Sequence, residues 1–556
     1  QSRGLGDVYK RQFVPPSYAL KDITRIPRWR KISSSEHGCR FWWLEYGGRL
    51  DTIHDTEQIK WEIWSVVYGV WDYIKNSGNF PDAENLTLSW VGTIPGKRES
   101  RRFEGEYTLV QQDIIEQRHH PDAVAFGGWA IDLHPADGVY SSQNGCIQYH
   151  SKGIYEIPYR CYCSRDIRNL FLAGRCISAS HVAHGSTRVM ATSGFGAQAI
   201  GMAAALCLQK GVLPADLTRP EFMRLLQQRL NLAGQSIPGI RIDSAGNLAA
   251  SARISASSEL RLAEIPFDGG WMPLDYSAAQ LLPLKAGVRY RFEIEVEACE
   301  ATVLEAELRY AAKPFNYTPD MTAERVRIPV EMGTCKLSVV FTGTVPSDQY
   351  GFVTFLKNNA LRIRSSKARY TGIVSVFNKF NEAVNNNGRQ TPPAGSGIDA
   401  FEFWCPDRRP AGQNIAMRIT PAIEAFSPSN VVNGFVRPTV TANAWCAAFG
   451  DKMPRLSFCW DVPQRIGRIR LFFDTDYDHA LESVQMGHPE RVIPFCVQGY
   501  RILDGHGNVV CECTDNHQTI NDIRLKETLE TDRLAIVVEH PSSEVAAALF
   551  QIHIEA

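Results

Sequence analysis

The chain has 556 residues and a mass of 62.3 kDa, enough for three or four domains at roughly 150 residues each. A single compact domain is therefore excluded. With 44% hydrophobic and 21% charged residues, the composition is that of a globular protein and not of a disordered one. The net charge of −1 provides no general attraction for nucleic acid or anionic lipid. We therefore expect neither a nucleic acid nor a membrane partner.

Residues 13–240 have a mixed α/β pattern. Apolar residues recur at three- and four-residue spacing in one segment, which predicts an amphipathic helix over 57–75. The other expected elements are shorter. They are strands at 86–94, 103–109 and 169–173, a short helix at 111–118, and a helix rich in small residues at 187–208. The longest apolar run, 194–208, is shorter than a membrane-spanning helix and includes Gln198, so no spanning helix is expected.

After residue 240 the hydrophobic period changes to two, which is typical of strands with one buried face. Alternation at 288–296 and 304–310 predicts a β-sandwich over 241–384. Asn, Gly and Pro residues predict a linker at 385–397. Alternation at 456–462 and 469–473 predicts a second β-sandwich within 398–556. The predicted fold is thus multidomain, with an α/β part followed by two all-β sandwich domains.

Residues 1–12 (QSRGLGDVYKRQ) begin with Gln and lack apolar periodicity, so we interpret them as a sequencing artefact and the chain as a fragment. A signal peptide therefore stays open. The fourteen cysteines are scattered, and the closest pairs, 161/163 and 511/513, are C-x-C and not C-x-x-C. We expect no metal site and no iron-sulfur cluster. Reduced thiols favour a cytoplasmic location.

The segment 169–208 combines a short strand ending in Gly174, a loop of small polar residues, and a helix containing Gly194, Gly196 and Gly201. Small side chains allow a backbone to approach a large flat or phosphorylated ligand closely. Glycine inside a helix costs about 1 kcal/mol relative to alanine, so close packing is expected in return. Tight packing between helix and sheet without any ligand explains the same residues equally well.

This segment resembles the C-terminal flavin motif of the FAD-dependent oxidoreductase family that includes relatives of the heterodisulfide reductase A subunit. In that motif AGR-x-IS is followed by H-x-A-x-GSxRVM and a G-Q-A-x-G helix. The residues that fit are Ala173, Gly174, Arg175, Ile177, Ser178, His181, Ala183, Gly185, Ser186, Arg188, Val189, Met190, Gly196, Gln198 and Gly201. Phe41–Thr56, Arg98–Arg102, Gly105–Tyr107, Asp132-x-His134 and Pro158–Arg160 resemble other signatures of the same family.

The resemblance implies FAD as cofactor, held by two halves of a site. The first half would be a βαβ lobe with a G-x-G-x-x-G turn. The early Gly4-Leu5-Gly6 lacks the third glycine, so we expect that half to lie outside this chain and the fragment to be inactive. The implied cofactor-binding residues are Gly174, Arg175, Ser178, Gly185, Ser186, Thr187, Arg188, Gly196 and Gln198.

Three residues near this motif are candidates for catalysis. His181 and His184 have the ordinary pKa suited to accepting a proton as hydride leaves a substrate, although a loop histidine is more often structural. Arg188, in the first turn of a helix beginning near Thr187, would add positive charge at the flavin edge. An exposed or phosphate-facing arginine is the alternative for Arg188.

Upstream residues are candidates for the substrate domain. Arg98, Arg101 and Arg102 crowd positive charge, which Glu99, Glu104 and Glu106 or a ligand would neutralise. Asp132 and His134 alternate along a predicted strand, so both should face one side, either in a pocket or as an ordinary surface pair. The remaining candidate is Arg160.

Residues 428–555 resemble a galactose-binding-like jelly roll of the discoidin type. Asn430, Gly434 and Trp445 fit its pattern, while Asn433 stands where an aspartate is usual. Asp474, Asp476 and Asp478 alternate but lack the glycine and glutamate of an EF-hand loop, so a solvated loop is expected there.

Together these features predict the C-terminal portion of a bacterial-type FAD-dependent oxidoreductase that transfers a hydride from a small organic substrate to flavin. A carbohydrate-related substrate is left open. One alternative is a glycan-binding protein with a vestigial flavin half. Another is an electron-transfer flavoprotein linked to an iron-sulfur cluster. Oligomeric state and electron acceptor stay open.

Overall fold

The computed structural model describes residues 12–34, 41–313, 315–316, 318–378, 389–392, 394, 400–402, 404–406, 414–475 and 496–556. The chain divides into two compact units. Unit 1 comprises Gln1–Phe103, Ala130–Tyr149 and Ala383–Asn385, and unit 2 comprises Glu104–Trp129, His150–Glu382 and Asn386–Ala556. Residues 1–11, most of the predicted artefact, lie outside the described residues, so that interpretation stays a prediction.

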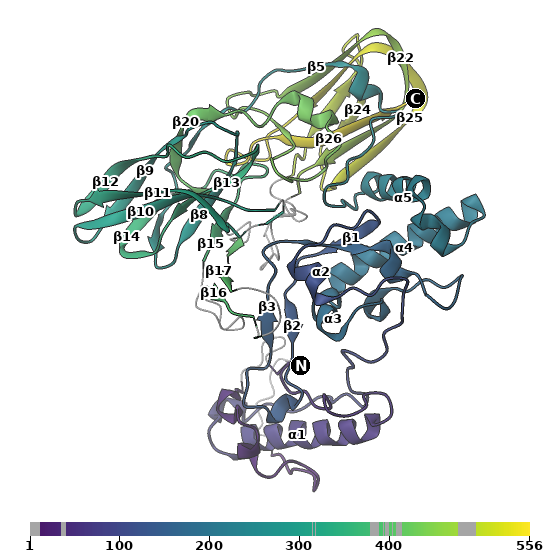
Figure 1. The fold of residues 1–556 in the computed structure, drawn as a ribbon, viewed down its shortest axis with the longest axis vertical. Helices are drawn as coiled ribbons and strands as arrows, with labels where there is room; N and C mark the ends of the chain where they lie inside the picture. Colours follow the sequence, from purple (N-terminus) through teal and green to yellow (C-terminus); the bar gives the residue numbers. More distant parts are fainter. Residues whose placement is uncertain are drawn as a thin grey trace. The chain divides into compact units, whose positions relative to one another are not determined.

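Unit 1 is built on one long helix, α1 (Thr56–Asn76), which confirms the helix predicted over 57–75 (Figure 1). Its buried face includes Val66, Val70 and Ile74, which pack with residues preceding the helix. Gly69 faces Leu20 so closely that a Cβ would lie 2.5 Å from the backbone oxygen of Leu20. The unit also holds the hairpin of β2 (Ile131–Leu133) and β3 (Ile147–Tyr149). Its 3-10 turns are η1 (Ile23–Arg25), η2 (Trp29–Lys31), η3 (Pro81–Ala83) and η4 (Gly138–Tyr140).

Two predicted strands did not form as expected. Residues 86–94, all of them described, contain no strand, and the Trp90 and Ile94 side chains are 79% and 80% exposed. An extended segment needs a neighbour to satisfy its backbone, and no described segment pairs with this one. Within 103–109 only Gly105 and Leu109 form isolated bridges, to Ser164 and Ala179.

The α/β part of unit 2 consists of a two-stranded antiparallel sheet and four helices. The strands are β1 (Ala123–Gly127) and β4 (Tyr155–Pro158). The helices are α2 (Gln111–Ile115), α3 (His181–Thr187), α4 (Met190–Lys210) and α5 (Pro220–Leu232). Helix α4 packs against both β1 and α5 (Figure 1). The 3-10 turns of this part are η5 (Tyr159–Tyr162), η6 (Gly174–Cys176) and η7 (Pro214–Thr218).

The helix predicted over 187–208 is two helices instead. The chain leaves helical geometry at Val189, which has a ψ of 147°, so α3 ends at Thr187 and α4 begins at Met190. Gly211, in the left-handed conformation, ends α4. At 21 residues α4 is longer than its apolar run and, by length and composition, is long and apolar enough to cross a membrane; 39% of its most apolar window is buried inside the protein.

Three large sheets form the β part of unit 2, which confirms the expected β-sandwich class. Sheet 1 contains β8 (Ala278–Leu284), β10 (Thr302–Tyr310), β11 (Met321–Val330), β13 (Gln349–Phe355), β15 (Ser375–Phe377) and β18 (Cys405–Pro406). Sheet 2 contains β6 (Leu262–Ile265), β7 (Trp271–Leu274), β9 (Arg291–Ala298), β12 (Gly333–Val340), β14 (Asn358–Ser366), β19 (Asn414–Ile415) and β20 (Met417–Ile423). The alternation at 288–296 and 304–310 corresponds to β9 and β10.

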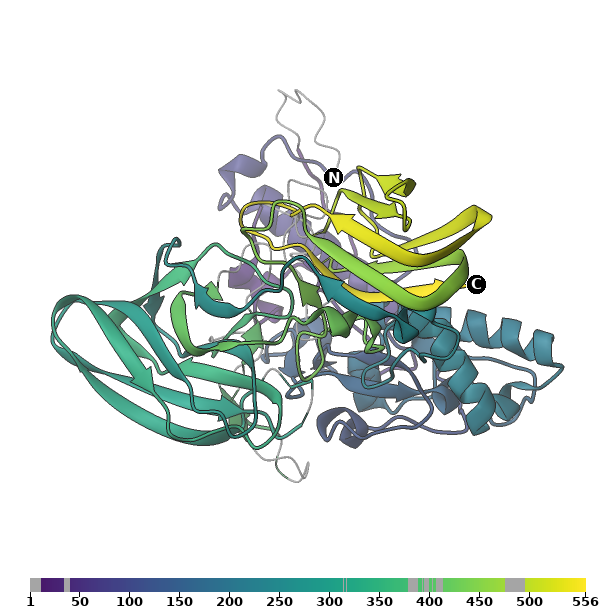
Figure 2. The same ribbon diagram turned by 90° about the horizontal axis from the view of Figure 1, so that it is seen from above.

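Sheet 3 contains β5 (Arg253–Ala256), β21 (Trp445–Cys446), β22 (Arg455–Phe473), β23 (Tyr500–Leu503), β24 (Val509–Cys513), β25 (Ile520–Val538) and β26 (Ala548–Glu555). Figure 2 shows its long curved strands in yellow and green. The two segments predicted at 456–462 and 469–473 are one continuous strand, β22, whose pairing with β25 shifts register between Cys459 and Gln464. Outside the three sheets, β16 (Arg389–Gln390) pairs with β17 (Phe401–Glu402), and η8 (Leu248–Ser251) and η9 (Pro428–Val432) are 3-10 turns.

The two sandwiches exchange strands across the boundaries expected from the sequence. Strands β19 and β20, expected in the second sandwich, pair with β14, β9 and β6 in sheet 2. Strand β5, expected in the first sandwich, pairs with β22 in sheet 3. The predicted linker 385–397 lies mostly outside the described residues. Composition predicts a linker, but it carries no information about which sheet each flanking strand joins.

This exchange predicts that residues 398–556 do not fold by themselves. Expressed alone, they would leave the edges of β19, β20 and β22 unpaired, which promotes aggregation. A polypeptide spanning 240–556 keeps both exchanged pairings and should unfold cooperatively by circular dichroism. A soluble 398–556 polypeptide with a sharp thermal transition would contradict the expectation.

Candidate functional site

The residues of the predicted flavin motif follow a set of extended segments tied by backbone hydrogen bonds. The Ser178 amide donates to Cys161 at 3.0 Å, and the Leu109 amide donates to Ser178 at 3.1 Å. The strand predicted over 169–173 is reduced to one bridge between Phe171 and Cys163. Gly174 then turns the chain with a φ of +65°, which explains glycine at this position.

Several motif residues serve internal packing. The Ser186 hydroxyl donates to the Trp129 carbonyl at 2.6 Å and accepts from the Tyr155 hydroxyl at 2.6 Å, so its hydrogen atom is already used. A Cβ on Gly196 would lie 2.4 Å from the Tyr162 hydroxyl, inside the core. The Ser178 hydroxyl is buried and hydrogen-bonded to Thr108 at 3.0 Å. For these residues the packing interpretation accounts for what the structure contains.

Other motif residues lie on an accessible surface. Met190 is 92% exposed, and Ala191, Gly194, Gln198 and Gly201 are exposed along the same helix. A Cβ on Gly194 or Gly201 would have no described neighbour within 4 Å. Arg175 and His181 are also exposed. Together with the open turn at Gly174, they provide a surface lined by small residues, which suits a large planar ligand.

Two polar features at the junction of α3 and α4 fit a bound cofactor. The Thr187 hydroxyl is buried and has no hydrogen-bond partner among the described residues. Helix α4 begins at Met190 without a described side chain capping its first amides, which therefore stay available as donors. An unsatisfied buried hydroxyl is costly, so a ligand that pairs with it is a reasonable expectation. The residues present fit a flavin at this junction.

The three catalytic candidates do not lie as the sequence suggested. Arg188 is the C-cap of α3, where its amide donates to the His184 carbonyl at 3.1 Å, and is not in the first turn of α4. His184 is buried at 3% exposure, whereas His181 is exposed at the first position of α3. The Ser180 hydroxyl caps α3 by accepting from the Ala183 amide. The sequence analysis missed the break because neither glycine nor proline marks it between Thr187 and Met190.

Arg160, a substrate-domain candidate, is engaged by Asp122. Its Nε and Nη2 atoms donate to the two Asp122 carboxylate oxygens at 2.9 and 3.1 Å, and its backbone amide donates to the same carboxylate. The guanidinium also lies 5.1 Å from the centre of the Tyr107 ring. This bidentate pair fixes the turn after β4.

In unit 1 the structure brings three predicted residues together around Glu45. Arg98 Nη2 lies 2.6 Å from one Glu45 oxygen, and His134 Nδ1 lies 2.9 Å from the other. His134 Nε2 lies 3.4 Å from Asp132, so these two residues do face the same side of the hairpin as predicted. We call Arg98, Glu45, Asp132 and His134 the histidine cluster.

Burial and hydrogen bonds shift the pKa values of His134 and of Cys146, which lies beside the histidine cluster. Burial alone would lower the pKa of His134, but hydrogen bonds with Asp132 and Glu45 outweigh it and raise that pKa. Burial, and then the nearby Asp132, raise the pKa of the Cys146 thiol to about 11, so it stays protonated at neutral pH. The backbone carbonyl of Glu45 accepts from the Val139 amide at 2.7 Å. A Cβ on Gly138 would lie 2.1 Å from that carbonyl.

The other two arginines of the predicted basic group point elsewhere. Arg102 forms an ion pair with Glu99, one of its expected partners, and Arg101 is exposed. The expected Glu104 pairs with Arg165 instead. The sequence analysis did not select Glu45, a member of the cluster, or Cys146 and Arg28, which lie in its surroundings, as site residues. Glu45 lies within the FWWLEYGG segment, and that resemblance was the available signal.

The residues of the jelly-roll pattern are structural in sheet 3 and its surroundings. Asn430 donates to the carbonyls of Ala425 and Ala444 at 2.9 Å each, and the fully buried Trp445 donates to Ser258. Gly434 has a φ of +87°, and its Cβ would lie 2.6 Å from the Ile242 carbonyl. Asp474 is buried and accepts from Thr371 at 2.8 Å, so it is not part of a solvated loop. Asp476 and Asp478 lie outside the described residues.

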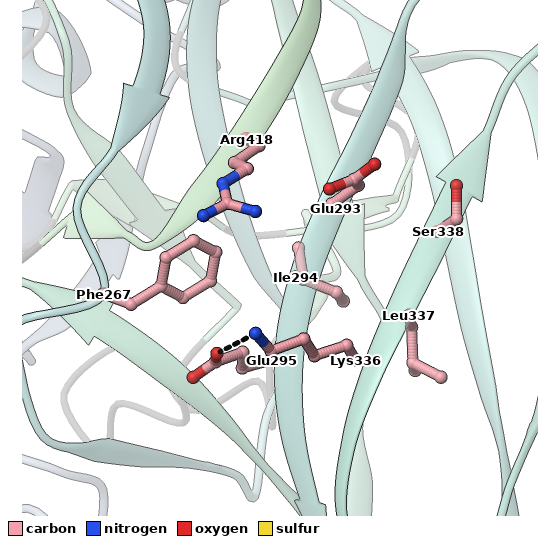
Figure 3. A pocket seen from close by; sticks show the side chains of 8 residues that line it. All are labelled: Phe267, Glu293, Ile294, Glu295, Lys336, Leu337, Ser338 and Arg418. Atoms are coloured by element: carbon pink, nitrogen blue, oxygen red, sulfur yellow. Dashed lines mark ion pairs between the residues drawn. The ribbon is translucent and has the colours of Figure 1, made fainter.

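Sheet 2 has a pocket of about 140 Å³ on its outer face. Along one edge, β9 pairs with β14 over residues 296–298 and with β20 over residues 291–293. Ile294 and Glu295 lie in the gap between these two partner strands. Figure 3 shows the Phe267 ring between Arg418 and Glu295. Glu295 also forms an ion pair with Lys336 of the neighbouring strand β12, at 3.6 Å. A cross-strand ion pair of this kind at the surface contributes little stability.

No group of three His, Cys, Asp or Glu side chains among the described residues is arranged to hold a metal ion. The C-x-C pair at Cys161 and Cys163 is buried. Burial raises the pKa of the Cys163 thiol to about 12 and also raises that of Cys161.

Comparison with known proteins agrees with the motif. Residues 6–230 match the model of the family described as FAD dependent oxidoreductase. No curated protein sequence matches the chain. This part of the chain therefore has the sequence pattern of flavin-dependent oxidoreductases, which supports that class of activity.

Several solved structures resemble a limited part of the chain. One is the family 32 carbohydrate-binding module from Streptococcus pneumoniae EndoD, at 12% identity and a TM-score of 0.19, covering 24% of this chain and 87% of that chain. Chitosan-binding module 1 from Paenibacillus sp. IK-5 has 14% identity and a TM-score of 0.18, covering 24% and 86%. Chitosan-binding module 2 from the same source has 13% identity and a TM-score of 0.18, covering 24% and 89%. Scores this low carry no functional inference.

Gly196 and Gly201 offer a matched pair for testing the packing of α4. Gly196→Ala places a methyl group against the buried Tyr162 hydroxyl and should destabilise the protein by about 1 to 3 kcal/mol. Gly201→Ala enters open space and should be neutral or stabilise by up to about 1 kcal/mol through helix propensity. Thermal unfolding compares them. Equal effects would mean that Gly196 is not packed as described.

The contacts in the histidine cluster predict a raised pKa for His134. His134 faces Glu45, Asp132, Arg98 and the Trp42 ring, and its pKa should lie above the ordinary value of about 6.5. Stability from protonated His134 is then complete below about pH 6.5 and is lost as pH rises through the raised folded pKa. NMR titration of histidine-labelled protein, assigned with His134→Gln, measures it. Glu45→Gln should lower the value, and an unchanged or lower pKa in the parent would contradict the hydrogen bonds.

Proposed function

We propose that the chain is part of an FAD-dependent oxidoreductase that removes a hydride from a small organic substrate. The family match over residues 6–230 carries this proposal, and the geometry at the junction of α3 and α4 supports it. The closer relation to the heterodisulfide reductase A subunit rests on the motif residues alone.

The residues proposed to hold the cofactor form a smaller set than the sequence motif. The Thr187 hydroxyl, buried and unpartnered among the described residues, would pair with a polar edge of the cofactor. The amides at the start of α4 would donate to an electron-rich edge. Gly174, Gly194 and Gly201 leave space for a planar ring. Ser178, Ser186 and Gly196 contribute by packing.

Bound FAD would supply a two-electron acceptor for hydride. The protein's own residues must then take the proton that the substrate releases when its hydride leaves. His181 is the better proton acceptor of the two candidates, because it is exposed and can pass the proton to solvent, whereas His184 is buried. Arg188, between the two helices, would place its positive charge beside the same junction.

The alternatives have less support. A glycan-binding function for the sandwiches would rest on structural likeness at TM-scores below 0.2, and the pattern residues Asn430, Gly434 and Trp445 are occupied in packing. An iron-sulfur-linked enzyme would require grouped thiolates, whereas the cysteines of this chain are scattered and their closest pairs are C-x-C.

Thr187→Val tests the cofactor assignment. Valine has nearly the shape of threonine, so removing an unsatisfied buried hydroxyl should stabilise the protein without FAD by about 1 kcal/mol. The same change should weaken FAD binding by about 3- to 10-fold, because one hydrogen bond is lost. Flavin fluorescence quenching during titration with FAD measures the affinity.

Thr192→Val is the matched control, since Thr192 is a buried threonine two residues inside α4. It should leave the FAD affinity unchanged. A stabilised Thr187→Val protein that binds FAD as tightly as the parent would remove Thr187 from the site. Failure of the parent to bind FAD at all, alone or with a supplied G-x-G-x-x-G lobe, would contradict the proposed function.

A further inference from the structure

Arg28 in unit 1 has a buried edge without an acceptor. Its Nε and Nη2 atoms are both buried and have no hydrogen-bond partner among the described residues. These two N–H groups lie on the same side of the planar guanidinium and match the two oxygens of a carboxylate. Leaving charged donors buried and unpaired is costly. The site therefore favours an anionic acceptor.

The surroundings hold the Arg28 side chain in place. Its guanidinium carbon lies 5.5 Å from the centre of the Trp43 ring, a cation–π distance. Next to it stands Gly145, where a Cβ would lie 2.7 Å from Arg28 Nη1 and 2.9 Å from the Trp42 ring. Only glycine leaves this approach open. Burial also lowers the pKa of Arg28, as expected for a cation short of compensating contacts.

The carboxylate whose charge acts on Arg28 is that of Glu45, and both of its oxygens are engaged by other groups. One Glu45 oxygen pairs with Arg98 and the other with His134, and Asp132 pairs with His134. Counting Arg28, Arg98 and a protonated His134 against Glu45 and Asp132, three positive charges face two negative ones. One further negative charge would balance the group.

We propose that Arg28 anchors a binding site for the carboxylate of a small organic acid. The two-pronged edge, the glycine beside it and the uncompensated charge all point to an oxyanion. The rings of Trp42 and Trp43 would contact the carbon skeleton of the acid. This binding site does not depend on the proposed function.

Direct binding tests the site. Sodium succinate is titrated into the full chain without added FAD, with calorimetry and tryptophan fluorescence as readouts. Succinamide, which has the same skeleton without charge, and inorganic phosphate at equal ionic strength are the comparison ligands. Succinate should bind, succinamide should not, and phosphate should bind more weakly because it has no carbon skeleton to contact the Trp42 and Trp43 rings. Phosphate binding more tightly than succinate would overturn the carboxylate assignment.

Arg28→Gln should weaken succinate binding by about 30-fold or more, because a buried charged hydrogen-bond pair is lost. Arg28→Lys keeps the charge but loses the two-pronged edge and should weaken binding about tenfold, which covers the case in which Arg28→Gln fails to fold. Arg30→Gln is the matched control, since Arg30 also lies over a tryptophan ring but is exposed. It should leave the affinity unchanged.

If succinate binds equally to the parent, Arg28→Lys and Arg28→Gln proteins, or binds none of them, the proposal is wrong. Because these titrations contain no FAD, their failure leaves the cofactor test at Thr187 unaffected. Failure of that test likewise leaves the anion site standing.

Discussion

The hydrogen bonds of Ser186 are the constraint on which the flavin motif depends. The hydroxyl donates to the Trp129 carbonyl and accepts from the buried Tyr155 hydroxyl, so α3 is tied to both strands of the small sheet, at the end of β4 and just beyond β1. A serine with both roles filled has one rotamer available. Because α3 is fixed in this way, the chain can break at Val189 and restart as α4 without losing its position, and the open amides of α4 stay beside the buried Thr187 hydroxyl.

The same arrangement shows why part of the motif was predictable and part was not. The helix over 57–75 was correct because its apolar stripe is regular, with Val66, Val70 and Ile74 one turn apart. The division of the motif into exposed and packed residues was not predictable, because a glycine is equally suited to both. Gly196 packs against Tyr162, and Gly201, five residues later, meets open space. Only the tertiary neighbours separate these two positions. Tertiary neighbours also explain the error at 86–94: no described segment pairs with these residues, so they form no strand.

In unit 1 the partners of the arginines could not be predicted from the sequence. The sequence predicted that nearby glutamates or a ligand would neutralise Arg98, Arg101 and Arg102 together, whereas folding assigns each arginine a separate environment. Arg98 joins a histidine held between two carboxylates, and Arg102 finds a local glutamate. Arg28, over a hundred residues before Asp132 in the chain, has a buried guanidinium edge without an acceptor among the described residues. The tertiary contacts of each arginine decide which one lacks a carboxylate partner, and spacing along the chain does not encode those contacts.

The exchange of strands between the two sandwiches has a consequence for how this protein could have evolved. Modules that fold independently are readily copied, deleted or recombined between genes, because each carries all of its own strands. Here β5 is encoded before the first sandwich but completes the sheet of the second, while β19 and β20 are encoded beyond the linker but complete the first. A recombination breakpoint anywhere between residues 266 and 416 would therefore divide at least two of the three sheets. The two sandwiches must be inherited together, as a single unit of about three hundred residues.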